Sequence, residues 1–115
     1  MRVLIADDDK NVGTAIAAMI RRCDHEVVEV VASGFDAIQA YNRHHPDLVL
    51  MDYYMPHLNG ATACRNILSR HPDANVILIS GVAGFGDLGH FGAIGMIPKP
   101  IQLSKLREVL DGALV

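Results

Sequence analysis

The apolar residues of this chain switch repeatedly between two periodicities, and that alternation limits the possible folds more than any other feature. Short runs rich in β-branched and aliphatic residues are separated by longer stretches in which apolar residues recur every three or four positions. A continuous run suits a strand buried on both faces of a parallel sheet, and the longer spacing is typical of an amphipathic helix. The runs that predict strands are Val3–Ala6, Val27–Val31, Leu48–Met51, Val76–Ile79 and Ile94–Ile97.

Four amphipathic stretches predict helices between and after these strands. In the first, Val12, Ile16 and Met19 fall on one helical face. The second begins with the Ser33–Asp36 spacing of a helix-start motif, because a serine there can accept a hydrogen bond from a free backbone N–H. The predicted helices cover residues 11–22, Ser33 to Pro46, about Gly60 to Ser69, and about Gln102 to Leu114.

The segment from Gly81 to Gly95 differs from the rest because six of its fifteen residues are glycine. Each glycine costs a helix about 1 kcal/mol relative to alanine, and these costs accumulate. We therefore expect a short or disordered helix there, around Asp87–Ala93.

Strands that alternate with helices predict a single α/β domain over residues 1–115, with a doubly wound parallel sheet and right-handed crossovers. The formal net charge of −3 argues against a nucleic-acid surface built from net positive charge. Cys23 and Cys64 provide no disulfide framework. The first apolar run is too short for a signal peptide and no later segment is long enough to span a bilayer, so we expect a cytoplasmic domain.

Polar residues stand where the predicted strands end, which is the edge of such a sheet where ligands bind. Asp7 and Asp8 follow the first strand, Asp52 the third, Ser80 the fourth and Lys99 the fifth. Carboxylates brought together repel one another and need cations, here the lysine and a metal ion. Oxygen ligands favour Mg²⁺. A carboxylate, a hydroxyl, an ammonium and Mg²⁺ around one point can stabilise phosphoryl transfer.

Other polar residues have simpler explanations. Asp9 is expected either to cap the first helix, where a carboxylate faces the positive end of the helix dipole, or to have no role. The chain has six histidines, and most of them fall at predicted helix ends or in turns, where a solvated imidazole is the default. We therefore predict no histidine metal site.

Four segments resemble the signature segments of bacterial two-component response regulator receiver domains, including the chemotaxis regulators, and stand in the same order: LIADDDKNV, DLVLMDYYMPHLNG, VILIS and PKP. The resemblance covers the whole chain. It implies a flavodoxin-like five-stranded sheet of order 2-1-3-4-5 with five helices. It also implies a module that is phosphorylated by a sensor histidine kinase or histidine phosphotransfer protein and is not itself an enzyme.

The resemblance assigns a role to each matched residue. Asp52 would be the phosphoacceptor. Mg²⁺ would be held by Asp7, Asp8, Asp52 and the backbone carbonyl of Tyr54. Ser80 and Lys99 would bind the transferred phosphoryl group, with the Lys99–Pro100 peptide bond in the cis form.

The sequence departs from the family where receivers usually carry a switching Tyr or Phe, three residues before the matched lysine. That position is Met96, whose flexible thioether gives a less discrete switch. Together with the glycine-rich segment, Met96 leaves open a receiver that binds partners without being phosphorylated.

Two further alternatives fit less well. A phosphatase of the haloacid dehalogenase type wants Thr or Val after the acidic run, where this chain has Asn11. A flavodoxin-like cofactor protein would want amides and hydroxyls in the loop after Ala6, where this chain is acidic. Because Pro98 cannot donate a ladder hydrogen bond, we also expect the fifth strand to lie at a sheet edge.

Overall fold

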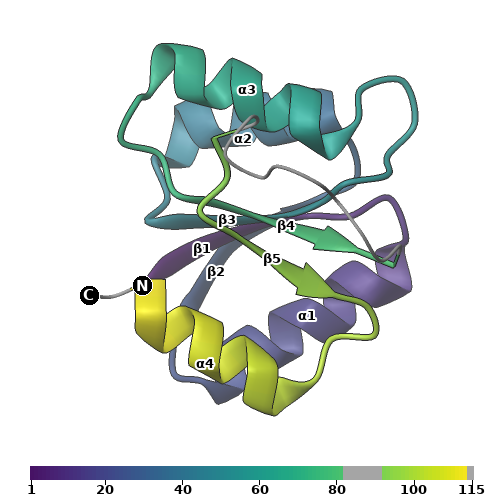
Figure 1. Cartoon of the computed structure of the whole chain (residues 1–115), viewed down its shortest axis with the longest axis vertical. Helices are drawn as coiled ribbons and strands as arrows, with labels where there is room; N and C mark the ends of the chain where they lie inside the picture. Colours follow the sequence, from purple (N-terminus) through teal and green to yellow (C-terminus); the bar gives the residue numbers. More distant parts are fainter. Residues whose placement is uncertain (82–91, 114–115) are drawn as a thin grey trace.

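A computed structural model describes residues 1–81 and 92–113 of the chain (Figure 1). Strands and helices alternate along it as the periodicity predicts, and the strand ends fall within one or two residues of the predicted ones. The elements are β1 (Arg2–Ala6), α1 (Lys10–Arg22), β2 (Glu26–Val31), α2 (Gly34–His44), β3 (Leu48–Asp52), α3 (Gly60–Arg70), β4 (Val76–Ser80), β5 (Gly95–Pro98) and α4 (Leu103–Ala113).

The five strands form one parallel sheet in the order β2-β1-β3-β4-β5, which confirms the predicted topology. Helices α1 and α4 lie on one face of the sheet, and α2 and α3 lie on the other (Figure 1). Strand β5 is an edge strand, as Pro98 required, and Pro98 pairs with Ser80 at the end of β4. The ends of β1 and β3 are direct neighbours, so the residues that follow them share one edge of the sheet.

The central strands β1, β3 and β4 are buried on both faces, which explains their continuous apolar runs, whereas the edge strand β2 is mostly half-buried and includes Glu26 and Glu29. In β1, Leu4 and Ala6 belong to a core cluster with residues of α2 and α3, whereas Val3 and Ile5 belong to a cluster with residues of α1 and α4. All four side chains are fully buried. Because successive strand residues point to opposite faces, a strand between two helical layers must be apolar at every position.

Side-chain caps begin three of the helices. Asp9 accepts hydrogen bonds from the backbone N–H groups of Asn11 (3.0 Å) and Val12 (3.4 Å), which confirms its predicted capping role. Ser33 caps α2 and Asn59 caps α3 in the same way. These caps fix where each loop at the carboxyl edge of the sheet ends, because they satisfy N–H groups that a helix leaves free.

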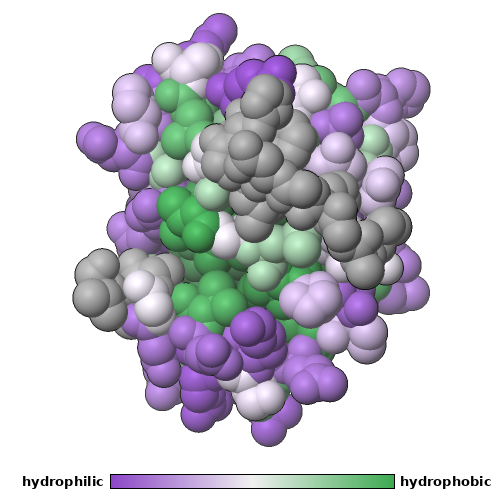
Figure 2. Space-filling model, viewed as in Figure 1, coloured by the Kyte–Doolittle hydropathy of each residue, from purple (hydrophilic) through white to green (hydrophobic). Residues whose placement is uncertain are grey.

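On the face shown in Figure 2, many of the side chains near the top and bottom are hydrophilic, and an apolar patch lies between them. A groove of about 340 Å³ near β5 and α4 is lined by Ile77, Ile94, Gly95, Val109 and Gly112. In the part of the chain that the structure describes, none of the helices has the length and apolar character needed to cross a bilayer.

The resemblance implies five helices, and the described residues contain four. Most of the helix expected around Asp87–Ala93 lies outside the described residues. Gly92 and Ala93, which are described, are not helical.

Candidate functional site

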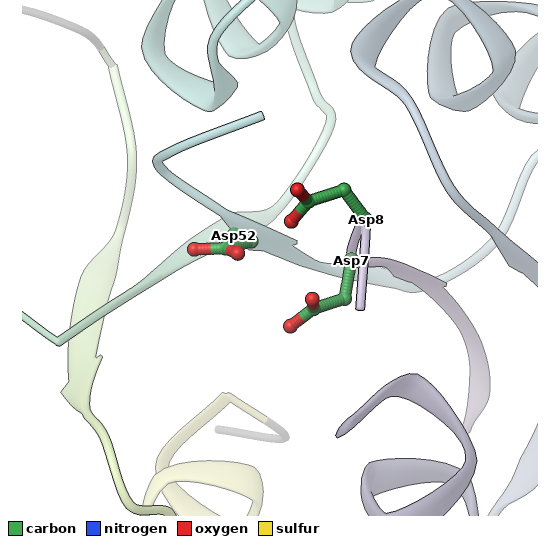
Figure 3. A group of neighbouring side chains, drawn as sticks. All are labelled: Asp7, Asp8 and Asp52. Carbon is green, nitrogen blue, oxygen red and sulfur yellow. The ribbon is translucent and has the colours of Figure 1, made fainter. Parts of the chain in front are cut away.

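Three carboxylates meet at the carboxyl edge of the sheet. Asp7 and Asp8 come from the segment after β1, and Asp52 is the last residue of β3 (Figure 3). One oxygen of each lies within 4.8 Å of the others, and their side chains extend to the same side. The topology brings them together because β1 and β3 are neighbouring parallel strands. The structure therefore assembles the acidic cluster that the strand-end pattern predicts.

Lys99 supplies a positive charge to this cluster from the end of β5. Its ammonium donates a hydrogen bond to Asp52 Oδ2 at 3.0 Å and lies 3.2 Å from Asp7 Oδ2. The lysine is held at the edge of the sheet because its backbone N–H donates to the Ser80 carbonyl at 2.8 Å. The peptide bond between Lys99 and Pro100 is cis, as expected.

The acidic site combines buried and exposed groups. Asp7 and Asp52 are only 1% and 5% exposed, whereas Asp8 is exposed.

Burial raises the pKa of Asp52, and repulsion from Asp7 adds to the rise, while the hydrogen bond from Lys99 opposes it. Partial burial acts to lower the pKa of Lys99, but the Asp52 and Asp7 carboxylates outweigh it and raise that pKa. The lysine therefore stays charged at neutral pH, and the carboxylates remain incompletely compensated.

The donor set of this cluster fits Mg²⁺. All three candidate ligands are carboxylate oxygens, and a hard divalent ion prefers oxygen donors. Asp7 Oδ2 is buried, and although the Lys99 ammonium lies 3.2 Å away, the oxygen accepts no well-aligned hydrogen bond from any described residue and so has room for a further cation. One oxygen of each carboxylate lies within 4.8 Å of the others, so the three residues could hold one ion between them.

The raised pKa of Asp52 predicts a pH-dependent effect of the Asp52→Asn variant on stability. Folding raises this pKa above its ordinary value of 3.8, so ionisation of the Asp52 carboxylate destabilises the folded state. This destabilisation is absent below pH 3.8 and develops as the pH rises through the raised pKa. Asparagine removes this cost, and Lys99 keeps its contact with Asp7. Without Mg²⁺, the variant should unfold at a higher temperature than the unsubstituted chain at pH 7.

Thermal unfolding between pH 4 and pH 7.5 measures this effect, and the advantage of the Asp52→Asn variant should shrink as the pH falls. An advantage that is equal at both ends of the range, or a variant that is less stable at pH 7, would show that the Asp52 charge does not destabilise the fold.

The other predicted site residues surround this cluster at different distances. Ser80 is buried at the end of β4, between the strands that carry Asp52 and Lys99. The Tyr54 N–H donates to Asp52 Oδ1 at 3.4 Å, which places the Tyr54 backbone beside the acidic site. Met96 is half-buried on β5 and pairs with Leu78, two residues before the end of β4, so it lies deeper along the sheet than the cluster.

The sequence reasoning missed one residue beside the site. The N–H of Gly60, the first residue of α3, donates to the Tyr53 carbonyl at 2.7 Å and closes the loop that follows Asp52. The available signal was a glycine at the start of a predicted helix, where other residues form helices more readily.

Comparison with known proteins places this site in a family. Residues 3–111 match the family model described as the response regulator receiver domain. The chemotaxis protein CheY of Listeria monocytogenes is 33% identical to the chain and covers 98% of it, with 98% of that protein covered in turn. CheY of Thermotoga maritima is also 33% identical, over 96% of this chain and 94% of its own length.

Solved structures agree with this comparison. The CheX–CheY–BeF3–Mg complex from Borrelia burgdorferi contains a chain that is 26% identical and superposes with a TM-score of 0.91, covering 100% of this chain and 90% of that one. A receiver domain of a Pseudomonas aeruginosa sensor histidine kinase has a TM-score of 0.88 at 27% identity, over 98% of this chain and 96% of that one. That structure has a magnesium ion coordinated in its active-site cleft.

Proposed function

The chain belongs to the response regulator receiver domain family of two-component signalling, and we propose that Asp52 is its phosphoacceptor, with a phosphohistidine of a partner protein as the donor. The observation that supports this role is the position of Asp52 between a lysine ammonium at 3.0 Å and two further carboxylates at the end of neighbouring strands. A buried carboxylate in this setting has a nucleophilic oxygen and a cation beside it for the charge of the incoming group.

The transfer follows from the chemistry of Asp52. One Asp52 carboxylate oxygen attacks phosphorus, the bond from phosphorus to the donor imidazole nitrogen breaks, and the electron pair stays on that nitrogen. The product is an acyl phosphate on Asp52. Lys99, already paired with Asp52 Oδ2, would turn toward the phosphoryl oxygens as negative charge gathers there.

We assign Asp7, Asp8, Asp52 and the Tyr54 backbone carbonyl as the residues that would hold Mg²⁺. When bound, the ion supplies positive charge at the phosphoryl oxygens and orients the donor. The role of Asp7 and Asp8 would be to bind the ion, and its charge would offset the repulsion between their carboxylates. The close approach of the three carboxylates supports this assignment.

We propose that Ser80 and Lys99 bind the phosphoryl group of the phosphorylated chain and that Met96 adjusts its conformation in response. Phosphorylation adds about −1.5 to −2 charge, which a hydroxyl and an ammonium can contact. Ser80 ends β4 and pairs with β5. A shift of Ser80 toward the phosphoryl group would therefore also move the paired β5 residues, which include Met96. The flexible methionine side chain could fill the space left by such a shift in several conformations.

We further propose that residues 1–115 act as one receiver domain and not as an enzyme, with a sensor histidine kinase or a histidine phosphotransfer protein as the partner. The family match over residues 3–111 supports this assignment in place of the dehalogenase-type and flavodoxin-like alternatives. A receiver that works without phosphorylation is the outcome that the next experiment must exclude.

The direct test is phosphorylation by a small-molecule donor. Incubation with acetyl phosphate and Mg²⁺ should add one phosphoryl group by intact-mass analysis, and EDTA should prevent the addition. Hydroxylamine, which cleaves acyl phosphates, should remove the added mass. No added mass with Mg²⁺ present would indicate a receiver that signals without phosphorylation.

A further inference from the structure

The loop that connects Asp52 to α3 is closed by a close backbone approach at Gly60. The hydrogen bond from the Gly60 N–H to the Tyr53 carbonyl (2.7 Å) ties the end of the loop to its beginning. A Cβ atom at residue 60 would overlap the Asp52 carbonyl oxygen and would lie 2.9 Å from Tyr53 Cα. Both neighbours are backbone atoms, so a side chain at residue 60 could be accommodated only by displacing the loop or the end of β3.

A second glycine packs against the other end of the same loop. Gly34 is the first residue of α2, and a Cβ there would lie 2.6 Å from the Leu58 carbonyl oxygen and 3.2 Å from Ala63 Cβ. The loop that both glycines contact also has an internal hydrogen bond, which the Leu58 N–H donates to the Pro56 carbonyl at 2.7 Å. The N-terminal ends of two helices therefore hold the loop from both sides.

This loop contains Tyr54, whose carbonyl is assigned to the metal site, and it begins directly after Asp52. The Tyr54 N–H donates to Asp52 Oδ1 at 3.4 Å. A shift of Tyr53 would move the Tyr54 carbonyl and the Asp52 carboxylate relative to Asp7 and Asp8. Groups that orient metal ligands typically contribute a factor of 10–100 to metal affinity.

We propose that Gly60, and to a smaller extent Gly34, are positioning residues of the phosphorylation site. By having no side chain, they let α3 and α2 approach the loop closely enough to direct the Asp52 carboxylate and the Tyr54 carbonyl toward Asp7 and Asp8. This inference rests on the proposed function of Asp52 and adds that two residues without functional groups set the affinity of that site for Mg²⁺.

The test compares Gly→Ala variants by titration with Mg²⁺ alone, followed by tyrosine fluorescence, since two of the three tyrosines lie in this loop. Gly60→Ala should weaken Mg²⁺ binding by about 10- to 100-fold and slow phosphorylation by acetyl phosphate at fixed Mg²⁺. Gly34→Ala should weaken binding less, because Leu58 is farther from Asp52. Gly112→Ala in α4 is the matched control, since a Cβ there meets nothing within 4 Å.

A loss of general stability must be separated from a loss of positioning. Ile20→Val removes one methyl group from the core cluster on the opposite face of the sheet and provides a destabilised variant with an unaltered loop. All variants are titrated at a temperature where circular dichroism shows them folded. A purely structural role would lower the unfolding temperature of Gly60→Ala and leave its Mg²⁺ affinity equal to that of Ile20→Val, and this result would overturn the inference.

The remaining outcomes are also decisive. If the unsubstituted chain binds no Mg²⁺, the proposed function fails, independently of the glycines. If the unsubstituted chain binds Mg²⁺ and both glycine variants bind it equally well, only the positioning inference fails. Should Gly60→Ala not fold, Gly34→Ala carries the test, and an unchanged affinity in that variant contradicts the proposal.

Discussion

Replacing Asp52 with asparagine is expected to abolish phosphorylation of the chain by acetyl phosphate. The amide has nearly the same shape as the carboxylate but no anionic oxygen that can attack phosphorus. Asp52 is also the only one of the three clustered carboxylates that ends a strand beside Ser80 and accepts a hydrogen bond from Lys99. Intact-mass analysis should show one added phosphoryl group in the unsubstituted chain and none in the variant.

The matched control for this experiment is Asp9→Asn. Asp9 lies two residues after Asp7, but its side chain caps α1, and asparagine is as good a helix cap as aspartate. The control should therefore be phosphorylated at the normal rate and should remain folded. An added mass that persists in Asp52→Asn would place the phosphoacceptor on another residue.

Mg²⁺ is expected to raise the unfolding temperature of the chain, because it would bind the folded acidic cluster and not the unfolded chain. At ten times its dissociation constant, a ligand of this kind stabilises the folded state by about 1.4 kcal/mol. For a domain of this size that corresponds to a rise of about 5–8 °C. Thermal unfolding with and without millimolar MgCl₂, at constant ionic strength, measures the rise.

The Asp8→Ala variant should lose most of this rise. Asp8 is exposed and is outside the ion pairs that Lys99 makes with Asp7 and Asp52, so its removal should leave the fold intact. Asp111→Ala removes an exposed acid from α4 and should keep the full rise. The metal site would have to be moved elsewhere if Asp8→Ala and Asp111→Ala responded equally, or if the unsubstituted chain did not respond at all.

The fold could be predicted from the sequence almost completely, because it depends on a pattern that repeats along the chain. A strand between two helical layers must be apolar at every position, as Val3 to Ala6 are, and a helix against a sheet must be apolar on one side. Strand order came from the family resemblance, and the local pattern alone would have allowed other orders. The apolar pattern predicted that β3 and β4 end one residue earlier than they do, because their last residues, Asp52 and Ser80, are polar.

The residue types of the candidate site were also predictable, because parallel strands carry their carboxyl ends to one edge of the sheet. Asp7, Asp8, Asp52, Ser80 and Lys99 could be named from their positions after strand patterns, and Asp9 could be set apart as a cap.

Only the tertiary structure decided how these residues act on one another. The pKa of Asp52 rises because burial and the nearby Asp7 outweigh the hydrogen bond from Lys99, and each effect depends on distances between residues far apart in the chain. The role inferred for Gly60 likewise follows from a carbonyl oxygen eight positions earlier that occupies the space of its missing side chain. A sequence pattern records which residue types are present, whereas burial, repulsion and steric overlap depend on separations that exist only once the strands and helices have packed.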